Sequence, residues 1–137
     1  ENRPTPYAER VFPDVKSVLE RLSLHPVPLV LASNTDRIDI ERALKETGIR
    51  SYFSQIYSAM DCVAPKPDPA VYEQAAKATG VPKSDILVFE DSAKGIEAAK
   101  AAGLIVWAIR DQQFGMDQSK ADKLVDSLEQ ALEWLQL

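Results

Sequence analysis

Hydrophobic residues along the chain follow two alternating patterns, one typical of helices and one typical of buried strands. Apolar residues return every three or four positions, as in amphipathic helices, in the segments 13–24, 36–48, 70–80, 93–103 and 124–137. Short and almost continuously apolar runs, typical of strands covered on both faces, occupy 27–33, 85–90 and 104–109, and a loop leads into a shorter strand within 52–59. This alternation predicts an α/β fold with a mainly parallel sheet.

Polar clusters follow three of the apolar segments, where ligands usually collect in parallel α/β sheets. Ser33, Asn34 and Thr35 end one predicted strand and precede a helix. Their hydroxyl and amide groups beside free helix N–H groups suit a phosphate. One of them capping the helix is the other interpretation, because Ser, Thr and Asn are all favoured there.

Lys66 and the adjacent pair Glu90 and Asp91 are the charged members of these clusters. Lys66 lies in the proline-rich segment 64–69, which restrains its backbone, and its ammonium could neutralise a phosphoryl group, although most lysines are simply solvated. Glu90 and Asp91 end the predicted strand 85–90, and two adjacent carboxylates suit Mg²⁺. The alternative is that Asp91 or Ser92 caps the next helix.

Composition narrows the class of protein. With 137 residues, 45% of them hydrophobic and 27% charged, the chain is predicted to be a single globular domain over 1–137, with an irregular polar lead at 1–10. The net charge of −5 argues against nucleic-acid binding. The sequence has no apolar run of about 20 residues, so we expect no membrane association and a cytoplasmic location.

The order of these motifs resembles the haloacid dehalogenase superfamily, in particular its phosphatase and β-phosphoglucomutase-like branch. The resemblance covers nearly the whole chain, and its most specific stretch is residues 86–109. It implies a Rossmann-like three-layer α/β/α core. It also implies that Ser33 binds the phosphoryl group with Asn34 beside it and that Lys66 neutralises the nucleophile and the phosphate. Asp91 would bind Mg²⁺ with Glu90 helping directly or through water, and the substrate would be a small phosphorylated metabolite.

One motif of that family is absent. Its aspartate nucleophile is followed two residues later by a second aspartate, and residues 1–137 contain no Asp-x-Asp. The resemblance implies that this motif ends a central strand, so we expect a sheet without its first strand and read residues 1–10 as the return from a cap domain. A second chain or a segment outside this sequence would supply the strand. We therefore expect a Mg²⁺-dependent phosphatase or phosphomutase in complete form and an inactive chain alone. The alternatives are a non-catalytic binding module and, less favoured, a dehalogenase.

Overall fold

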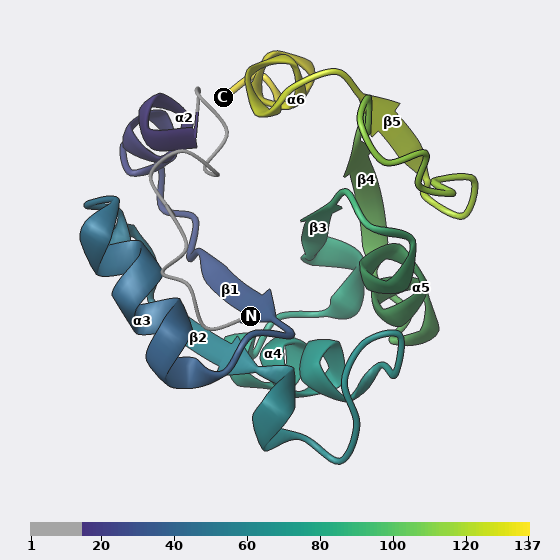
Figure 1. The fold of residues 1–137 in the computed structure, drawn as a ribbon. Coiled ribbons are helices and arrows are strands. Elements are labelled where there is room, and N and C mark those ends of the chain that lie inside the picture. The colour runs from purple at the N-terminus through teal and green to yellow at the C-terminus, as the bar shows by residue number, and fades with distance from the viewer. Residues whose placement is uncertain (1–14) are drawn as a thin grey trace.

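The computed structural model describes residues 15–137. The irregular lead predicted at 1–10 lies outside these residues, and the single-domain assignment of 1–137 stays a prediction. Strands and helices alternate over the described part, so the α/β prediction is confirmed (Figure 1). The α-helices are α2 (Val15–Leu22), α3 (Arg37–Glu46), α4 (Ala70–Thr79), α5 (Ala93–Ala101) and α6 (Leu128–Leu135). Short 3-10 turns occupy Arg50–Tyr52, Ala59–Asp61 and Lys83–Asp85.

The strands form two separate parallel sheets. The strands are β1 (Val30–Ser33), β2 (Gln55–Ser58), β3 (Leu87–Glu90), β4 (Ile105–Ile109) and β5 (Lys123–Val125). The first sheet is β1-β2 and the second has the order β3-β4-β5. All pairings are parallel, with Ser33 opposite Ser58 in one sheet and Glu90 opposite Ala108 in the other.

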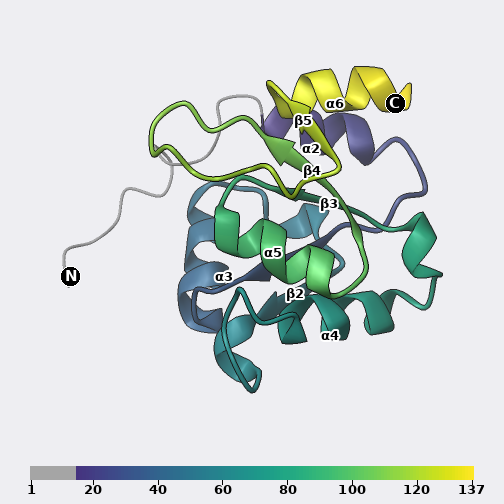
Figure 2. The same ribbon diagram turned by 90° about the vertical axis from the view of Figure 1, so that its right-hand side faces the viewer.

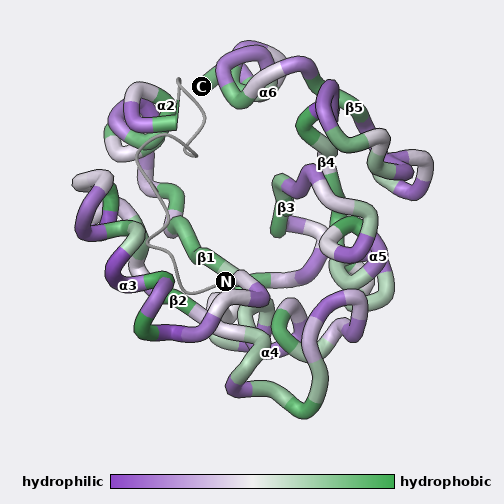
Figure 3. Tube along the Cα trace, in the orientation of Figure 1, coloured by the Kyte–Doolittle hydropathy of each residue, from purple (hydrophilic) through white to green (hydrophobic). Residues whose placement is uncertain are grey.

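Within residues 15–137, β1 and β3 each have a strand partner on one edge only. They lie on opposite sides of the middle of the view in Figure 1, and Figure 3 shows that both are mostly hydrophobic. This separation agrees with a sheet that lacks its central strand.

Helices join the two sheets on two sides. The helix α4 packs against β1 and β2 and also against α5, which covers β3 and β4. On the other side α2 packs against α6 through Val18, Leu22 and Leu132, and α6 also contacts β5. Figure 2 shows α2 and α6 together at one end of the molecule and α4 at the other. The two sheets therefore share helical layers although they share no strand ladder.

The C-terminal segment differs from its prediction. The helix predicted over 124–137 begins only at Leu128, and Lys123–Val125 form the strand β5. Val125 is fully buried, and its carbonyl accepts a hydrogen bond from the Arg110 amide at 2.8 Å. Ser127 then caps α6 by accepting from the Gln130 amide at 3.1 Å. Burial of Val125 against β4 therefore outweighed helical spacing in these few residues.

Candidate active site

The Lys66 side chain connects the two sheets at the carboxyl ends of their strands. Its Nζ donates to the Ala32 carbonyl of β1 at 3.1 Å and pairs with Glu90 Oε2 of β3 at 2.5 Å. It also donates to the Tyr72 hydroxyl of α4 at 3.3 Å. Only 9% of the Lys66 side chain and 10% of the Glu90 side chain are exposed. Lys66 is therefore a nearly buried cation at the junction of three elements and not a solvated surface lysine.

Asn34 fixes the loop that carries Lys66. Its Oδ1 accepts a hydrogen bond from the Lys66 backbone amide at 2.8 Å. The loop then turns, because the Asp68 amide donates to the Pro65 carbonyl, and the Asp68 carboxylate accepts from the Ala70 amide where α4 begins. The Asn34 side chain thus anchors Lys66, which is a role that the sequence did not indicate.

Ser33 lies at the end of β1, and the following helix is capped by a different residue. The Ser33 Oγ accepts from the Thr35 amide at 3.0 Å. Asp36 is the N-cap of α3 and accepts from the Asp39 amide at 2.9 Å. The interpretation of Ser33, Asn34 or Thr35 as the helix cap is therefore wrong. The Thr35 amide donates to the Ser33 oxygen, so the Ser33 hydroxyl can still donate its own proton to another acceptor.

Glu90 and Asp91 are adjacent in sequence but differ in their surroundings. Glu90 faces Lys66 and accepts a hydrogen bond from the Tyr72 hydroxyl. Ser92 caps α5 by accepting from the Gly95 amide at 3.0 Å, so Asp91 does not serve as the cap. The Asp91 side chain reaches the surface, while its backbone carbonyl accepts from Gln118.

Electrostatics single out Asp91 as the group that a cation would stabilise. Partial burial of the Asp91 carboxylate raises its pKa, and the negative charges of Glu90 and Asp111 raise this pKa further. A hydrogen bond from the Asp91 backbone amide and the charge of Lys66 lower the Asp91 pKa but do not cancel these effects. A nearby cation would therefore lower the free energy of the ionised Asp91 carboxylate.

The carboxylates partly fit a magnesium ion. No cluster of three or more His, Cys, Asp or Glu side chains suited to a metal occurs within residues 15–137. Asp91 offers an oxygen ligand of the right type, whereas Glu90 Oε2 is already held by Lys66 and Tyr72. Magnesium would need water or further oxygen ligands, and the assignment of Asp91 and Glu90 to it stays a prediction.

Two residues of this region were missed at the level of the sequence. Tyr72 is 6% exposed on the buried face of α4, whose other residues are apolar, and a buried tyrosine hydroxyl usually has a partner. Ser58 is 1% exposed, and its Oγ donates to the Thr35 carbonyl at 2.6 Å. The only sequence signal for Tyr72 is a polar atom among alanines and valine, and Ser58 has none.

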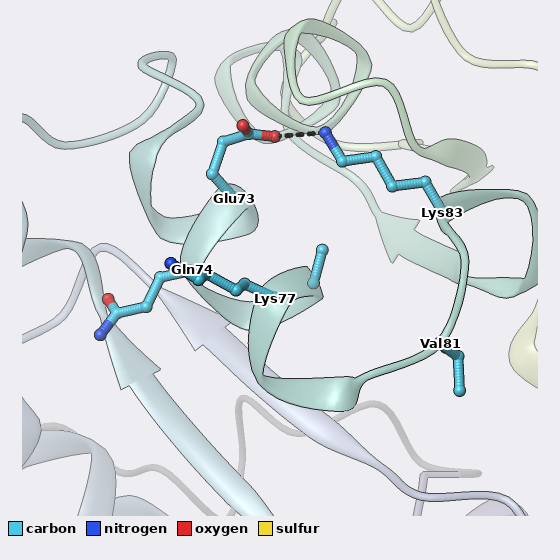
Figure 4. A pocket seen from close by; sticks show the side chains of 6 residues that line it. Glu73, Gln74, Lys77, Val81 and Lys83 are labelled. Atoms are coloured by element: carbon cyan, nitrogen blue, oxygen red, sulfur yellow. Dashed lines mark hydrogen bonds and ion pairs between the residues drawn. The ribbon is translucent and has the colours of Figure 1, made fainter.

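A pocket of about 450 Å³ lies elsewhere, on the outer side of α4 (Figure 4). It is lined by Glu73, Gln74, Ala76, Lys77, Val81 and Lys83. Lys83 pairs with Glu73 at 2.7 Å across its edge. This pocket contains none of the predicted site residues, so it is separate from the candidate site.

Among the described residues, no helix has the length and apolar character needed to cross a membrane. This finding concerns residues 15–137 and leaves the predicted location of the protein as an expectation.

Known proteins are similar to this chain in both sequence and fold. Residues 7–109 match the family described as haloacid dehalogenase-like hydrolase. The phosphoglycolate phosphatase of Neisseria gonorrhoeae is 29% identical over 93% of the chain and 56% of its own length. The (S)-2-haloacid dehalogenase of Pseudomonas putida is 32% identical over 96% of the chain and 56% of its own length.

A solved structure of a provisionally assigned β-phosphoglucomutase from Thermotoga maritima superposes with a TM-score of 0.82. It is 27% identical and covers 91% of the chain and 59% of that structure. The chain thus spans somewhat more than half the length of these relatives. Together with the parallel sheets and the Rossmann-like α/β fold, the family match shows that the chain belongs to the haloacid dehalogenase-like hydrolases, in their phosphatase-like branch.

Proposed function

We propose that this chain forms most of the core of a Mg²⁺-dependent phosphatase or phosphomutase that acts on a small phosphorylated metabolite. One observation carries the proposal: the nearly buried Lys66 ammonium lies between the carboxyl ends of β1 and β3 and contacts both. It contacts the residue before Ser33 and the residue before Asp91. A fixed cation between a hydroxyl donor and a free carboxylate suits a phosphoryl group that is transferred with a metal.

Each residue has a defined task in this proposal. The Ser33 hydroxyl donates its proton to a phosphoryl oxygen, and the Lys66 ammonium offsets the charge on the phosphoryl group. Asn34 keeps the Lys66 backbone in place through its 2.8 Å hydrogen bond. Asp91 would hold magnesium, with Glu90 acting through water. When bound, magnesium stabilises negative charge on the phosphoryl oxygens.

The nucleophile has to come from outside residues 1–137, because they contain no Asp-x-Asp. We propose that a segment outside this sequence, or a second chain, adds a strand between β1 and β3. The two edges support this, since β1 and β3 each have one strand partner in the described part, and Lys66 contacts residues near the carboxyl end of both strands. An unpaired apolar edge is a ready template for another strand. The greater length of the relatives agrees with it.

An aspartate at the end of that strand would lie beside Lys66. Its carboxylate oxygen would bond to phosphorus as the bond to the alcohol oxygen breaks, and the second aspartate would give the departing alcohol its proton. Water would then hydrolyse the aspartyl phosphate and release inorganic phosphate. Lys66 alone binds charge but supplies no attacking oxygen, so we expect the chain without the strand to be inactive.

The test is complementation of the chain by a synthetic apolar strand that ends in Asp-x-Asp-Gly-Thr. We expect this peptide to produce Mg²⁺-dependent hydrolysis of an aryl phosphate, and Asp91→Asn to abolish it. A peptide with Asn in place of the first Asp is the matched control, because it can pair with the sheet but cannot attack.

Three outcomes distinguish the candidate functions. Activity with the Asp peptide alone supports phosphoryl transfer. If both peptides raise the Tm equally and neither gives hydrolysis, the non-catalytic binding module is favoured. Release of chloride from a 2-chlorocarboxylic acid without hydrolysis of the phosphate ester would favour a dehalogenase.

A further inference from the structure

The Tyr72 hydroxyl, which no motif pointed to, takes part in a closed triangle of polar contacts. It accepts a hydrogen bond from Lys66 Nζ at 3.3 Å and donates to Glu90 Oε2, to which Lys66 also donates at 2.5 Å. The Tyr72 ring lies under the same ammonium, with Nζ 4.9 Å from its centroid. Both the polar and the aromatic parts of Tyr72 thus contact Lys66.

The direction of each hydrogen bond in the triangle is fixed by chemistry. An ammonium can only donate, and a carboxylate can only accept. A tyrosine hydroxyl, whose ordinary pKa is about 10, carries its proton at neutral pH. The Tyr72 proton therefore goes to Glu90, and its oxygen receives one from Lys66.

This arrangement leaves one Lys66 proton for a ligand. The Tyr72 oxygen and Glu90 Oε2 are hydrogen-bonded to each other, so both lie in nearly the same direction from Lys66 Nζ. The three N–H bonds of the ammonium, in contrast, point in tetrahedral directions well apart from one another. One N–H therefore serves both acceptors, and a second serves the Ala32 carbonyl. The third N–H is free to meet an anion.

Gly95 restrains Glu90 from the opposite side. A Cβ built on Gly95, which lies in the first turn of α5, would overlap both carboxylate oxygens of Glu90. The carboxylate is thus held between the first turn of α5 and the Tyr72 hydroxyl. Without either restraint, the Glu90 carboxylate could turn and bring its second oxygen to another Lys66 N–H, since both carboxylate oxygens accept hydrogen bonds.

We propose that Tyr72 is a positioning residue that holds Glu90 to a single Lys66 proton and so keeps the third proton available for a phosphoryl oxygen. This inference rests on the proposed function, because it assumes that Lys66 binds phosphate. The structural role of Tyr72 then has a consequence for anion affinity that packing alone would not give.

The experiment is a titration of the 137-residue chain with inorganic phosphate, followed by NMR signals of the Lys66 ammonium and its neighbouring CH₂ group. We expect Tyr72→Phe, which keeps the ring and loses the hydroxyl, to weaken phosphate binding about tenfold through loss of one charge-assisted hydrogen bond. Tyr52→Phe is the matched control, since Tyr52 packs against the separate apolar cluster that contains Ile40 and Ile56. It should leave the affinity unchanged.

A second background separates positioning from packing. In Glu90→Gln the neutral amide oxygen binds the ammonium more weakly than the carboxylate does, so Tyr72→Phe should weaken phosphate binding much less there than in the parent chain. Gly95→Ala disturbs Glu90 from the other side and should weaken phosphate binding as Tyr72→Phe does. It provides the same test if Tyr72→Phe does not fold.

Each remaining outcome counts against a definite statement. If the parent chain binds phosphate at Lys66 and Tyr72→Phe binds it equally well, the role of Tyr72 is wrong and the proposed function stands. An equal loss in the parent and in the Glu90→Gln background would reduce Tyr72 to packing. If phosphate leaves the Lys66 signals of the parent chain unchanged, both the proposed function and this inference fall.

Discussion

The strand β4 and the strand β1 have similar apolar sequences but differ in how well they are buried. In the three-stranded sheet β4 lies between β3 and β5, and its residues Val106 and Ala108 are fully buried. All four residues of β1 are only half-buried, although α4 packs against that sheet. The half-burial of β1 agrees with a missing strand on its unpaired edge, since β1 has one strand partner within the described residues.

The same difference divides the hydrophobic core. One cluster gathers β3, β4, α4 and α5 around Val71 and Val106, and a separate one gathers α2, α3 and β2 around Ile40 and Ile56. The two halves of the molecule, one built on β1-β2 and the other on β3-β4-β5, meet through helices and through the Lys66–Glu90 ion pair. Because each half has its own apolar cluster, we expect mutations in the two halves to change the free energy of unfolding by different amounts.

The largest expected effect compares matched leucines in the two halves. Leu104, just before β4, is 2% exposed, whereas Leu31 in β1 is half-buried. We expect Leu104→Ala to lower the free energy of unfolding by about 2–5 kcal/mol and Leu31→Ala by about 1–2 kcal/mol, since cavity cost follows burial. Urea unfolding measures both, and equal losses would mean that β1 is as well covered as β4.

A second prediction concerns the ion pair between the halves. Lys66→Met leaves the nearly buried Glu90 carboxylate without its cation, which should cost about 2–3 kcal/mol in urea unfolding. The double variant Lys66→Met with Glu90→Leu should recover most of this loss because it removes the unpaired charge. Lys120→Met, at a surface pair that is 62% exposed on the lysine side, is the control and should change little. If Lys66→Met is as stable as the double variant, the ion pair between Lys66 and Glu90 does not stabilise the contact between the halves.

The smallest expected effect concerns the pH dependence of stability in the half built on β3-β4-β5. Asp122 accepts a hydrogen bond from Lys100 and another from the Val106 amide at 2.8 Å, and these bonds lower its pKa. A lowered carboxyl pKa stabilises the fold above the pKa of the unfolded chain, about 3.9, and this stability is lost as pH falls through the folded value. Asp122→Asn should therefore cost about 1 kcal/mol at neutral pH, and the difference from the parent should shrink in acid. A pH-independent difference would contradict the charge as its cause.

The sequence predicted the elements better than it predicted the contacts between them. The α/β class followed from alternating patterns because those patterns are local. The strand β5 was missed because three residues are too few to show a period, and their burial depends on β4. Lys66 was chosen for its proline-rich loop, but its contacts with Ala32 and Glu90 join residues far apart in the chain.

Only part of the candidate site could be predicted from the sequence, because the contacts of its side chains depend on the fold. The adjacent carboxylates Glu90 and Asp91 suggested a shared task, yet the fold turns Glu90 to Lys66 and leaves Asp91 at the surface. The polar atom that completes this arrangement belongs to Tyr72, which in the sequence is one more residue of an apolar helix face. Such a role depends on packing between α4 and β3 and has no local signature.

Hydrogen exchange at the amides of β1 and β3, with and without the strand peptide ending in Asp-x-Asp-Gly-Thr, tests the divided sheet most directly. We expect weak protection on the unpaired edges of both strands in the chain alone and a joint rise in protection when the peptide binds. The amides of β4, which already has two neighbours, should change little. Strong protection of β1 and β3 without the peptide, with no further change on its addition, would mean that the two strands pair with each other and that no strand is missing.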